Sequence, residues 1–259
     1  MQSAHSNSKL LSALAHATHI WLARPRALIR AGRTADFLAQ LNQAERDRYH
    51  KFVFDKDRYH FLSAHILVRT ALSQYADISP QQWQFTCNNY GRPEIAGESN
   101  APPLRFNLSH TNGLVVCVVT HEIDCGIDAE EIRPLSGYLS IARQMFTSDE
   151  YESLTLCPAD RQYAAFFNYW TLKEAYIKAR GLGLALATDG FQFSIDSSNE
   201  VSILFKEGLD DHHDAWQFQL MQLADKHAVA LAIRPGRDKP RHVIRHRWLS
   251  DQAMQLIKA

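Results

Sequence analysis

The sequence lacks several features that would point to particular classes of protein. Its four cysteines form no CxxC pair, which argues against a zinc knuckle or a thioredoxin-like motif and favours reduced packing residues. No apolar run approaches the roughly 20 residues that are needed to cross a bilayer. Lysine plus arginine equals aspartate plus glutamate, 28 each, so the basic excess typical of general nucleic-acid binders is missing.

What is present is an ordinary globular composition. The chain has 259 residues, 46% of them hydrophobic and 22% charged, which is enough for one large domain or two small ones. The apolar stretch at residues 10–15 is too short for a signal peptide and contains Ser12. The sequence therefore predicts a cytoplasmic protein with neither nucleic acid nor membrane as its partner.

A similar order of elements occurs in each half of the chain. Each half has a long helix (55–75 and 162–180), then a strand (83–87 and 191–195), then a β pair that ends in an apolar run (106–120 and 216–233). This order predicts an α+β fold, a pseudo-dimer of two similar lobes at residues 19–121 and 122–259, after a loose extension at residues 1–18. A cleft between two lobes is a natural ligand site, so we expect the active site there. One continuous α+β domain is the alternative.

Two acidic residues stand in the segment Gly126-Ile127-Asp128-Ala129-Glu130. Positions two apart on a strand face the same side, so Asp128 and Glu130 would project together. Neighbouring carboxylates repel unless a cation lies between them, and hard oxygen ligands suit Mg²⁺. Solvated surface acids would give the same pattern.

A third acid and a lysine stand in the predicted helix at residues 162–180. Glu174 and Lys178 share one face with Trp170, because residues four apart are neighbours on a helix. A solvated Glu–Lys pair would explain them. The apolar stripe on the opposite side instead indicates a buried helix, whose charged groups are candidates for a site.

Polar residues are dense in Phe106-Asn107-Leu108-Ser109-His110-Thr111. This set of hydrogen-bonding groups could hold a phosphate, with His110 supplying charge when protonated. A Ser–His nucleophile pair is disfavoured, because adjacent residues on an extended chain point to opposite faces.

Four phrases, GRP, FNLSHT, GIDAE and WTLKEAYIKARGLGL, occur in this order. Together they resemble the 4′-phosphopantetheinyl transferase superfamily in its Sfp-like (surfactin-synthetase-activating) branch, over about residues 45–195. The resemblance implies the two-lobed α+β fold. It also implies a holo-[acyl-carrier-protein] synthase activity, in which phosphopantetheine moves from the substrate coenzyme A to a serine of an apo acyl or peptidyl carrier protein and adenosine 3′,5′-bisphosphate is released.

The resemblance also implies roles for individual residues. The metal ligands would be Asp128, Glu130 and Glu174, with Mg²⁺ as the cofactor and Mn²⁺ as the alternative ion. The catalytic residues would be Glu130, Glu174 and Lys178. Contacts to coenzyme A would come from Arg58, Arg92, Ser109, His110, Asp128 and Lys178. His60 lies in the same basic stretch as Arg58, where the alignment is ambiguous, and Arg92 stands where the family often has lysine.

The sequence does not decide which residue accepts the proton of the carrier serine. Glu130 could accept it directly or through a metal-bound water, and Lys178 could do so if burial lowered its pKa.

Carrier proteins of this class are usually acidic, so their docking surface should be basic with apolar anchors. Arg143, Met145 and Phe146, soon after the acidic strand, are one candidate, although Met145 and Phe146 could equally fill the core. The basic stretch 234–247 is a second candidate, or else a solvated tail.

Two other functions remain as alternatives. One is a non-catalytic module that binds coenzyme A or a carrier protein, and the other is a different Mg²⁺-dependent enzyme acting on a nucleotide diphosphate. We expect a monomer, because one chain already supplies two similar lobes.

Overall fold

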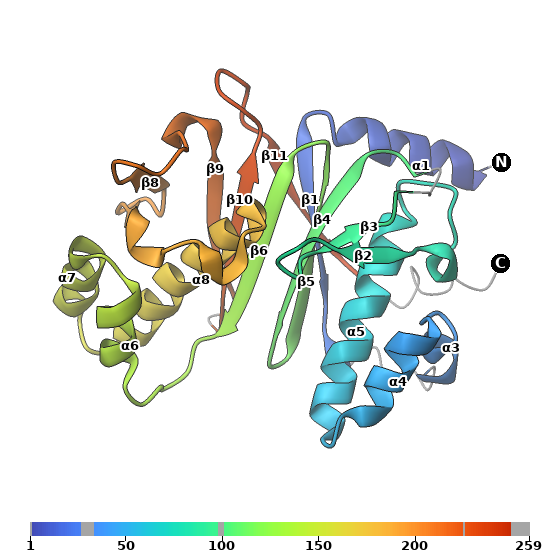
Figure 1. The fold of residues 1–259 in the computed structure, drawn as a ribbon, viewed down its shortest axis with the longest axis horizontal. Coiled ribbons are helices and arrows are strands. Elements are labelled where there is room, and N and C mark those ends of the chain that lie inside the picture. The colour runs from blue at the N-terminus through green and yellow to red at the C-terminus, as the bar shows by residue number, and fades with distance from the viewer. Residues whose placement is uncertain (1, 27–33, 98–100, 225, 250–259) are drawn as a thin grey trace. The chain divides into compact units, whose positions relative to one another are not determined.

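The structure, a computed structural model, describes residues 2–26, 34–97, 101–224 and 226–249 (Figure 1). The chain divides into two compact units. The first consists of Met1–Asn89, Pro93–Ile123 and His242–Ala259, and the second of Tyr90–Arg92 and Asp124–Arg241. In the part of the chain that is described, no helix combines the length and the apolar character needed to span a membrane.

The first unit is built on a four-stranded sheet in the order β11-β1-β5-β4. Strand β5 pairs antiparallel with both β1 and β4, and β11 runs parallel to β1. The strands are β1 (Ala17–Ala23), β4 (Leu104–Thr111), β5 (Leu114–His121) and β11 (Val243–Trp248). The β-branched run in β5 is buried along all but its last residue, which confirms the buried strand predicted from it.

Helix α5 (Asp55–Leu72) contacts all three antiparallel strands of this sheet. Its residues Leu62, Ile66 and Leu67 recur at helical spacing and are buried, so they form the core between helix and sheet. The other elements of this unit are α1 (Gln2–Ala13), α3 (Thr34–Leu38), α4 (Gln43–Lys51), the 3₁₀ turn Pro80–Gln82, and the hairpin of β2 (Phe85–Cys87) and β3 (Pro93–Ile95).

Helix α4 is fixed to α5 through Glu45. The Glu45 carboxylate accepts from the backbone N–H of Asn42, and Asn42 in return accepts from the N–H of Glu45, which starts the helix with a capping box. The same carboxylate accepts from Arg69 of α5 at 2.7 Å. Its hydrogen bond with His65 and the charge of Arg69 outweigh the effect of burial and lower the pKa of Glu45 to about 2.

The second unit is built on a three-stranded antiparallel sheet in the order β6-β10-β9. Helix α8 (Gln162–Arg180) packs along β6 and β10, and it ends at Gly181, whose φ of 67° is the left-handed conformation that glycine adopts readily. The remaining bounds are β6 (Asp124–Glu131), α6 (Tyr138–Met145), α7 (Ser148–Leu156), β7 (Phe191–Ile195), β8 (Val201–Phe205), β9 (Gln217–Leu223) and β10 (His227–Arg234), with short 3₁₀ turns at Gly183–Ala185, Thr188–Gly190 and His213–Ala215.

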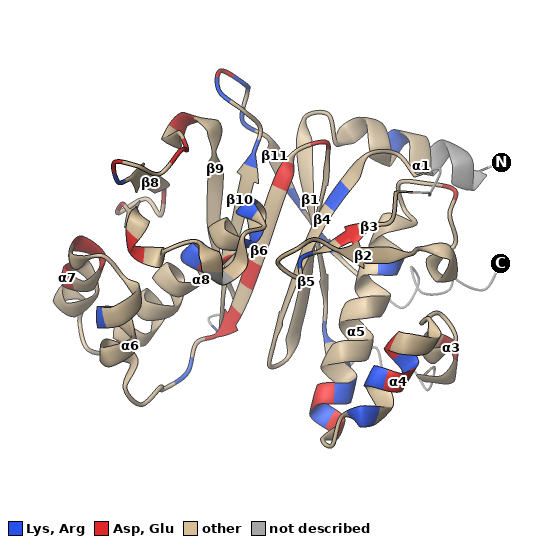
Figure 2. Ribbon diagram, in the orientation of Figure 1, with Lys and Arg blue, Asp and Glu red and all other residues tan. Residues whose placement is uncertain are grey.

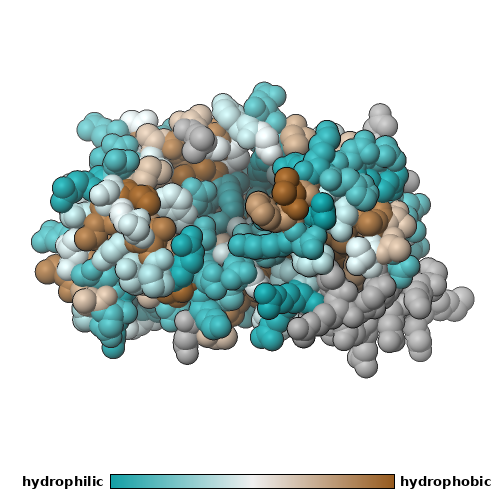
Figure 3. Space-filling model, turned by 90° about the horizontal axis from the view of Figure 1, so that it is seen from below, coloured by the Kyte–Doolittle hydropathy of each residue, from teal (hydrophilic) through white to brown (hydrophobic). Residues whose placement is uncertain are grey.

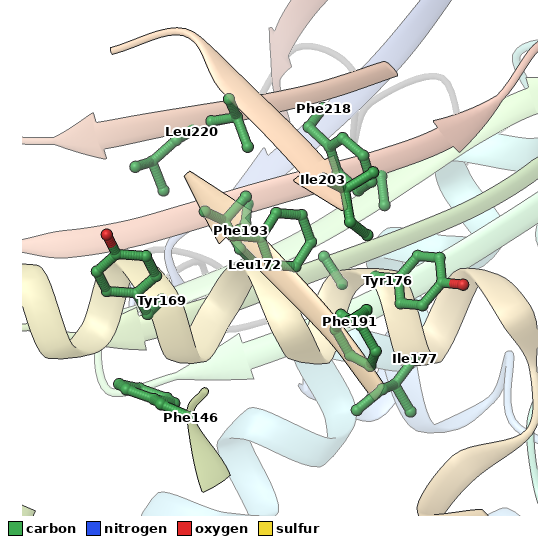
Figure 4. Close-up of a cluster of buried hydrophobic side chains, with 14 of the residues drawn as sticks. Phe146, Tyr169, Leu172, Tyr176, Ile177, Phe191, Phe193, Ile203, Phe218 and Leu220 are labelled. Carbon is green, nitrogen blue, oxygen red and sulfur yellow. The ribbon is translucent and has the colours of Figure 1, made fainter. Parts of the chain in front are cut away.

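Aromatic side chains form much of the core of the second unit, as Figure 4 shows around α8. Tyr176 lies 4.7 Å from Phe191 and 4.9 Å from Trp216, measured between ring centroids. Phe193 of the β7–β8 hairpin packs on Phe218 of β9 at 5.0 Å. These contacts join the hairpin and the sheet to the same side of the helix.

The two units have the same order of elements and the same strand pairing. In each, a first strand is followed by helices, a two-stranded hairpin and two more strands, and the first strand pairs with the last, which pairs with the one before it. The first strands are β1 and β6, and the pairs that complete the sheets are β4–β5 and β9–β10. The prediction of an α+β fold made of two similar lobes is thereby confirmed.

The structure departs from the predicted boundaries at both ends of the chain. Residues 2–13 form α1 instead of a loose extension, because Leu10 and Leu11 pack on the first unit's core and Asn7 donates to the carbonyl of Ala76. At the other end, residues 243–248 form β11 of the first unit, although the prediction placed them in the C-terminal lobe. Tyr90–Arg92, assigned by sequence to the N-terminal lobe, belong to the second unit.

Candidate active site

Strand β6 carries two of the predicted metal ligands, Asp128 and Glu130. Their side chains leave the same face of the sheet, and Ile127 and Ala129, which alternate with them, are buried. Asp128 is buried at 5% exposure, whereas Glu130 is half-buried. The acidic segments of β6 are red in Figure 2. These carboxylates therefore belong to the packed part of the unit and are not ordinary solvated surface acids.

Lys178 of α8 contacts this strand directly. Its Nζ lies 2.6 Å from Oδ1 of Asp128 and also donates to the carbonyl oxygen of Ile127 at 3.3 Å. Glu174, four residues earlier on the helix, is half-buried on the same side. Lys178 thus contacts the neighbouring strand, which a solvated Glu174–Lys178 pair on the helix surface would not explain.

The three carboxylates influence one another electrostatically. Burial raises the pKa of Glu130 to about 7, and the charge of Asp128 adds to the rise while Lys178 and Arg133 oppose it. Burial, again followed by the charge of Asp128, also raises the pKa of Glu174. Asp128, Glu130 and Glu174 therefore lie close enough for like charges to disfavour ionisation.

The donor chemistry of this cluster fits a divalent cation. Carboxylate oxygens are the ligands that Mg²⁺ prefers, and a cation would relieve the mutual repulsion of the acids. Among the described residues, however, no three histidine, cysteine, aspartate or glutamate side chains are already arranged to hold an ion. Asp128 contacts Lys178 instead, so coordination by Asp128, Glu130 and Glu174 together requires their side chains to move.

Arg92, a predicted contact for coenzyme A, lies in the second unit with the acidic cluster. It is buried, and its Nη2 donates to the carbonyl oxygen of Cys125 at 2.9 Å, next to the start of the acidic segment. The preceding Gly91 has a φ of 82°, which makes the turn predicted from GRP. The structure thus places Arg92 beside β6, with one donor committed to the strand's backbone.

Ser109 and His110, the predicted phosphate contacts, lie near the end of β4 in the first unit. Ser109 is buried and His110 is exposed, as expected for adjacent residues on opposite faces of a strand, so they do not form a nucleophile pair. The ring of His110 lies 5.7 Å from that of His60 on α5. Arg58, on the same helix, donates to Asp55 at 2.9 Å. The structure therefore brings His60, left ambiguous by sequence, next to His110.

The candidate carrier anchor at residues 143–146 needs a correction. Phe146 is 5% exposed, and its ring centroid lies 5.5 Å from that of Phe166 and 5.8 Å from that of Tyr169. It is therefore a core residue and not a surface anchor; Phe146 and Tyr169 are labelled in Figure 4. Met145 is half-buried against the same core. Arg143 is exposed and donates to the hydroxyl of Tyr151. The alternative that Met145 and Phe146 fill the core is the one that the structure supports.

The basic stretch 234–247 is exposed along much of its length, but it is not a loose tail. Its last residues belong to β11, and three of its arginines form ion pairs within the second unit: Arg234 with Asp211 at 3.4 Å, Arg237 with Asp214 at 3.1 Å and Arg241 with Glu200 at 3.4 Å.

On the face drawn in Figure 3, hydrophobic residues form separate patches within a mainly hydrophilic surface.

Two residues close to the predicted ligands in the sequence have structural roles that the sequence did not reveal. Lys173, next to Glu174, is buried and pairs with Glu150 at 2.8 Å while donating to the carbonyls of Thr188 and Phe191. A lysine on the apolar side of a helix was the available signal, because such a residue is buried only when paired. Gly126, in the same phrase as Asp128, is the other, and it is in backbone contact with α8.

Comparisons with known proteins agree with these observations. The model of the 4′-phosphopantetheinyl transferase superfamily matches residues 124–232, and that of the 4′-phosphopantetheinyl transferase N-terminal region matches residues 32–122. The transferase HetI from Nostoc sp. is 35% identical over 69% of this chain and 73% of its own length. A 4′-phosphopantetheinyl transferase from Bacillus subtilis is 30% identical over 73% of this chain and 80% of its own length. The chain belongs to the 4′-phosphopantetheinyl transferase superfamily, which confirms the family predicted from the four phrases.

Similarity to solved structures is more limited. A holo-(acyl-carrier-protein) synthase from Bacillus anthracis, solved in complex with coenzyme A, superposes with a TM-score of 0.37 at 18% identity. The match covers 43% of this chain and 96% of that one. A match at this TM-score supports no conclusion about the site.

Proposed function

We propose that the protein transfers 4′-phosphopantetheine from coenzyme A to a serine of an apo acyl or peptidyl carrier protein and releases adenosine 3′,5′-bisphosphate. The observation that carries the proposal is the cluster of Asp128, Glu130, Glu174 and Lys178, in the unit matched by the superfamily model. Three mutually repelling carboxylates beside a lysine are of little use to a module that only binds a ligand. The cluster thus favours catalysis over the binding-module alternative.

Asp128, Glu130 and Glu174 are the residues that would hold Mg²⁺, or Mn²⁺ in its place. The bound ion would neutralise charge on the diphosphate of coenzyme A. Because Asp128 pairs with Lys178 in the structure, Lys178 would be released to contact a phosphate when Asp128 turns to the ion. Its ammonium group suits that contact, since it presents a compact positive charge with three donors.

The transfer itself is a substitution at phosphorus. The carrier serine oxygen forms a bond to the phosphorus next to pantetheine, and the bond from that phosphorus to the bridging oxygen breaks, so adenosine 3′,5′-bisphosphate leaves with the electron pair. Positioning and charge neutralisation supply most of the catalysis in such reactions. Lys178 acts as a hydrogen-bond donor in the structure, which favours Glu130 as the acceptor of the serine proton.

The remaining candidates would bind coenzyme A. His110 is exposed near the end of β4 with His60 beside it, and we assign this pair to the 3′-phosphate. Ser109 is buried on the opposite face of the strand, so its hydroxyl would contact coenzyme A only after a local rearrangement. Arg92 and Arg58 are proposed as further phosphate contacts, Arg58 only after it exchanges Asp55 for the ligand.

The experiment that tests the proposal is incubation with coenzyme A, Mg²⁺ and a panel of apo carrier proteins, followed by intact-mass measurement. The proposal expects one phosphopantetheine added to at least one carrier. A module that only binds coenzyme A would leave every carrier mass unchanged. An enzyme acting on another nucleotide diphosphate would consume that substrate while the carriers stay unmodified.

A further inference from the structure

The contact between α8 and the sheet of the second unit is lined by very small side chains. In the sheet register, Gly126 lies opposite Ala232 and Asp128 opposite Ala230, so these residues share the face under the helix. All the alanines of this contact are buried at 1% exposure or less. We call this set the small-residue seam: Gly126, Ala228, Ala230 and Ala232 on the strands, and Ala175 and Ala179 on α8.

At Gly126 the seam is a contact of backbone with backbone. A Cβ atom at this position would lie 2.0 Å from the carbonyl oxygen of Ala175 and 2.4 Å from the backbone nitrogen of Ala179. Neither atom can rotate away as a side chain can. Only glycine therefore allows β6 and α8 to approach this closely.

The close approach lies directly beside the acidic cluster. Asp128 is two residues from Gly126 on the same face of β6, which is about 6.6 Å along the strand. On the helix, Lys178 directly precedes Ala179 and Glu174 directly precedes Ala175. The separation of the two backbones at Gly126 thus sets the positions from which Lys178 and Glu174 reach towards Asp128, as in the 2.6 Å contact of Lys178.

We propose that Gly126 is a positioning residue for the transfer reaction, which acts by fixing the height of α8 above β6 and so the placement of Lys178 and Glu174 relative to Asp128. The inference rests on the proposed function. Gly126 touches no substrate in this account. It affects the rate of transfer by positioning Lys178 and Glu174.

The expected effect of Gly126→Ala follows from the distances. Moving the new methyl carbon from 2.0 Å to the 3.0 Å below which such contacts essentially never occur requires a displacement of about 1 Å. A misplacement of about 1 Å in a catalytic arrangement can cost about 100-fold in rate. We expect kcat to fall by about that factor, while KM for the carrier stays within about threefold.

Two control variants separate positioning from stability. Gly190→Ala, in the same unit, introduces a methyl group whose nearest neighbour would be 4.0 Å away, and should retain wild-type kinetics. Leu154→Ala removes a buried side chain of α7 and should lower the melting temperature without touching the seam. Rates are compared per folded molecule, at a temperature where circular dichroism shows each variant to be folded.

A double-mutant cycle with Lys178→Met supplies the readout that a merely structural glycine would not change. If Gly126 acts through Lys178, adding Gly126→Ala to Lys178→Met should cost about tenfold or less, against about 100-fold in the wild-type background. Additive losses would overturn the inference, as would a Gly126→Ala protein that keeps kcat within threefold of wild type. A wild-type protein that modifies no carrier would instead contradict the proposed function. If Gly126→Ala fails to fold, Ala230→Ser takes its place, because it adds one oxygen atom under the same helix. Losses that add to those of Lys178→Met, or a kcat within threefold of wild type, would again overturn the inference.

Discussion

Replacement of Lys178 by methionine tests the arrangement of the acidic cluster most sensitively. The substitution keeps an unbranched side chain of similar length and removes the ammonium group that lies 2.6 Å from Asp128. The charge of Lys178 also opposes the pKa rise of Glu130 and Glu174, so both carboxylates become harder to ionise without it. We therefore expect the metal-free protein to lose stability.

The size of the loss follows from burial. The Asp128 side chain is 7% exposed and that of Lys178 28%, so the pair is only partly screened by solvent. Removing one partner of a fully buried pair costs ~3–5 kcal/mol, and a hydrogen bond to a charged group contributes ~1.5–3 kcal/mol. For this partly exposed pair we expect about 2 kcal/mol, which corresponds to a fall of roughly 4–8 °C in Tm.

The same variant should lose activity and respond more strongly to metal. Loss of one positioned charge at a reacting phosphate costs about 100- to 1,000-fold in kcat. Without Lys178 the carboxylates lose the positive charge that contacts Asp128, so a bound cation would relieve more of their repulsion and Mg²⁺ should raise the Tm of Lys178→Met more than that of the wild type. Lys206→Met is the matched control, because Lys206 is exposed and lies 3.8 Å from the equally exposed Asp189. Wild-type stability and activity in Lys178→Met would refute the arrangement, as would an equal Mg²⁺ response.

Three further predictions concern the other candidate residues. Glu174→Ala should abolish transfer but leave the protein folded, because it removes a repelling charge, and EDTA should stop the wild type until Mg²⁺ is restored; full activity of Glu174→Ala would exclude it as a ligand. His110→Ala should weaken binding of coenzyme A by about tenfold or more, and binding of 3′-dephospho-coenzyme A much less, since a charge-assisted hydrogen bond contributes ~1.5–3 kcal/mol; equal weakening in calorimetry would reject the 3′-phosphate contact. Phe146→Ala should lower the free energy of unfolding by ~3–5 kcal/mol because the ring is in the core; an unchanged Tm with a raised KM for the carrier would restore its docking role.

Much of the fold follows from local patterns in the sequence. Two local patterns each identify an element. The run of β-branched residues marks β5, which is buried along nearly its whole length, and the spacing of Leu62, Ile66 and Leu67 marks the buried face of α5. The glycine after α8 likewise marks its end. The order of these elements was sufficient to predict two similar lobes.

The parts that the sequence did not predict depend on distant contacts. The edge strand β11 pairs with β1, more than two hundred residues earlier, and none of its residues is buried, so it lacks the alternation that marks a half-buried strand. Phe146 follows an amphipathic helix, and only the packing of Phe166 and Tyr169 against it decides that it lies in the core. Such outcomes depend on tertiary neighbours that spacing along the chain does not reveal.

The candidate site, too, was predicted from the sequence only in part. The alternation along β6 and the i,i+4 relation on α8 predict which carboxylates share a face. They do not predict that Lys178 reaches across to Asp128, nor that Arg92 donates to the backbone beside β6. The contact of Lys178 depends on how closely α8 packs on β6, where a Cβ at Gly126 would clash with the helix backbone, and the contact of Arg92 depends on a turn that brings it beside the strand.

The most direct test of the central claim is the stoichiometry of the transfer. With coenzyme A, Mg²⁺ and an apo carrier protein, adenosine 3′,5′-bisphosphate is quantified by chromatography and the carrier by intact mass. We expect one molecule of adenosine 3′,5′-bisphosphate for each phosphopantetheine gained, and neither product when the carrier serine is replaced by alanine. Release of the nucleotide without modification of the carrier, or modification that persists without that serine, would contradict it.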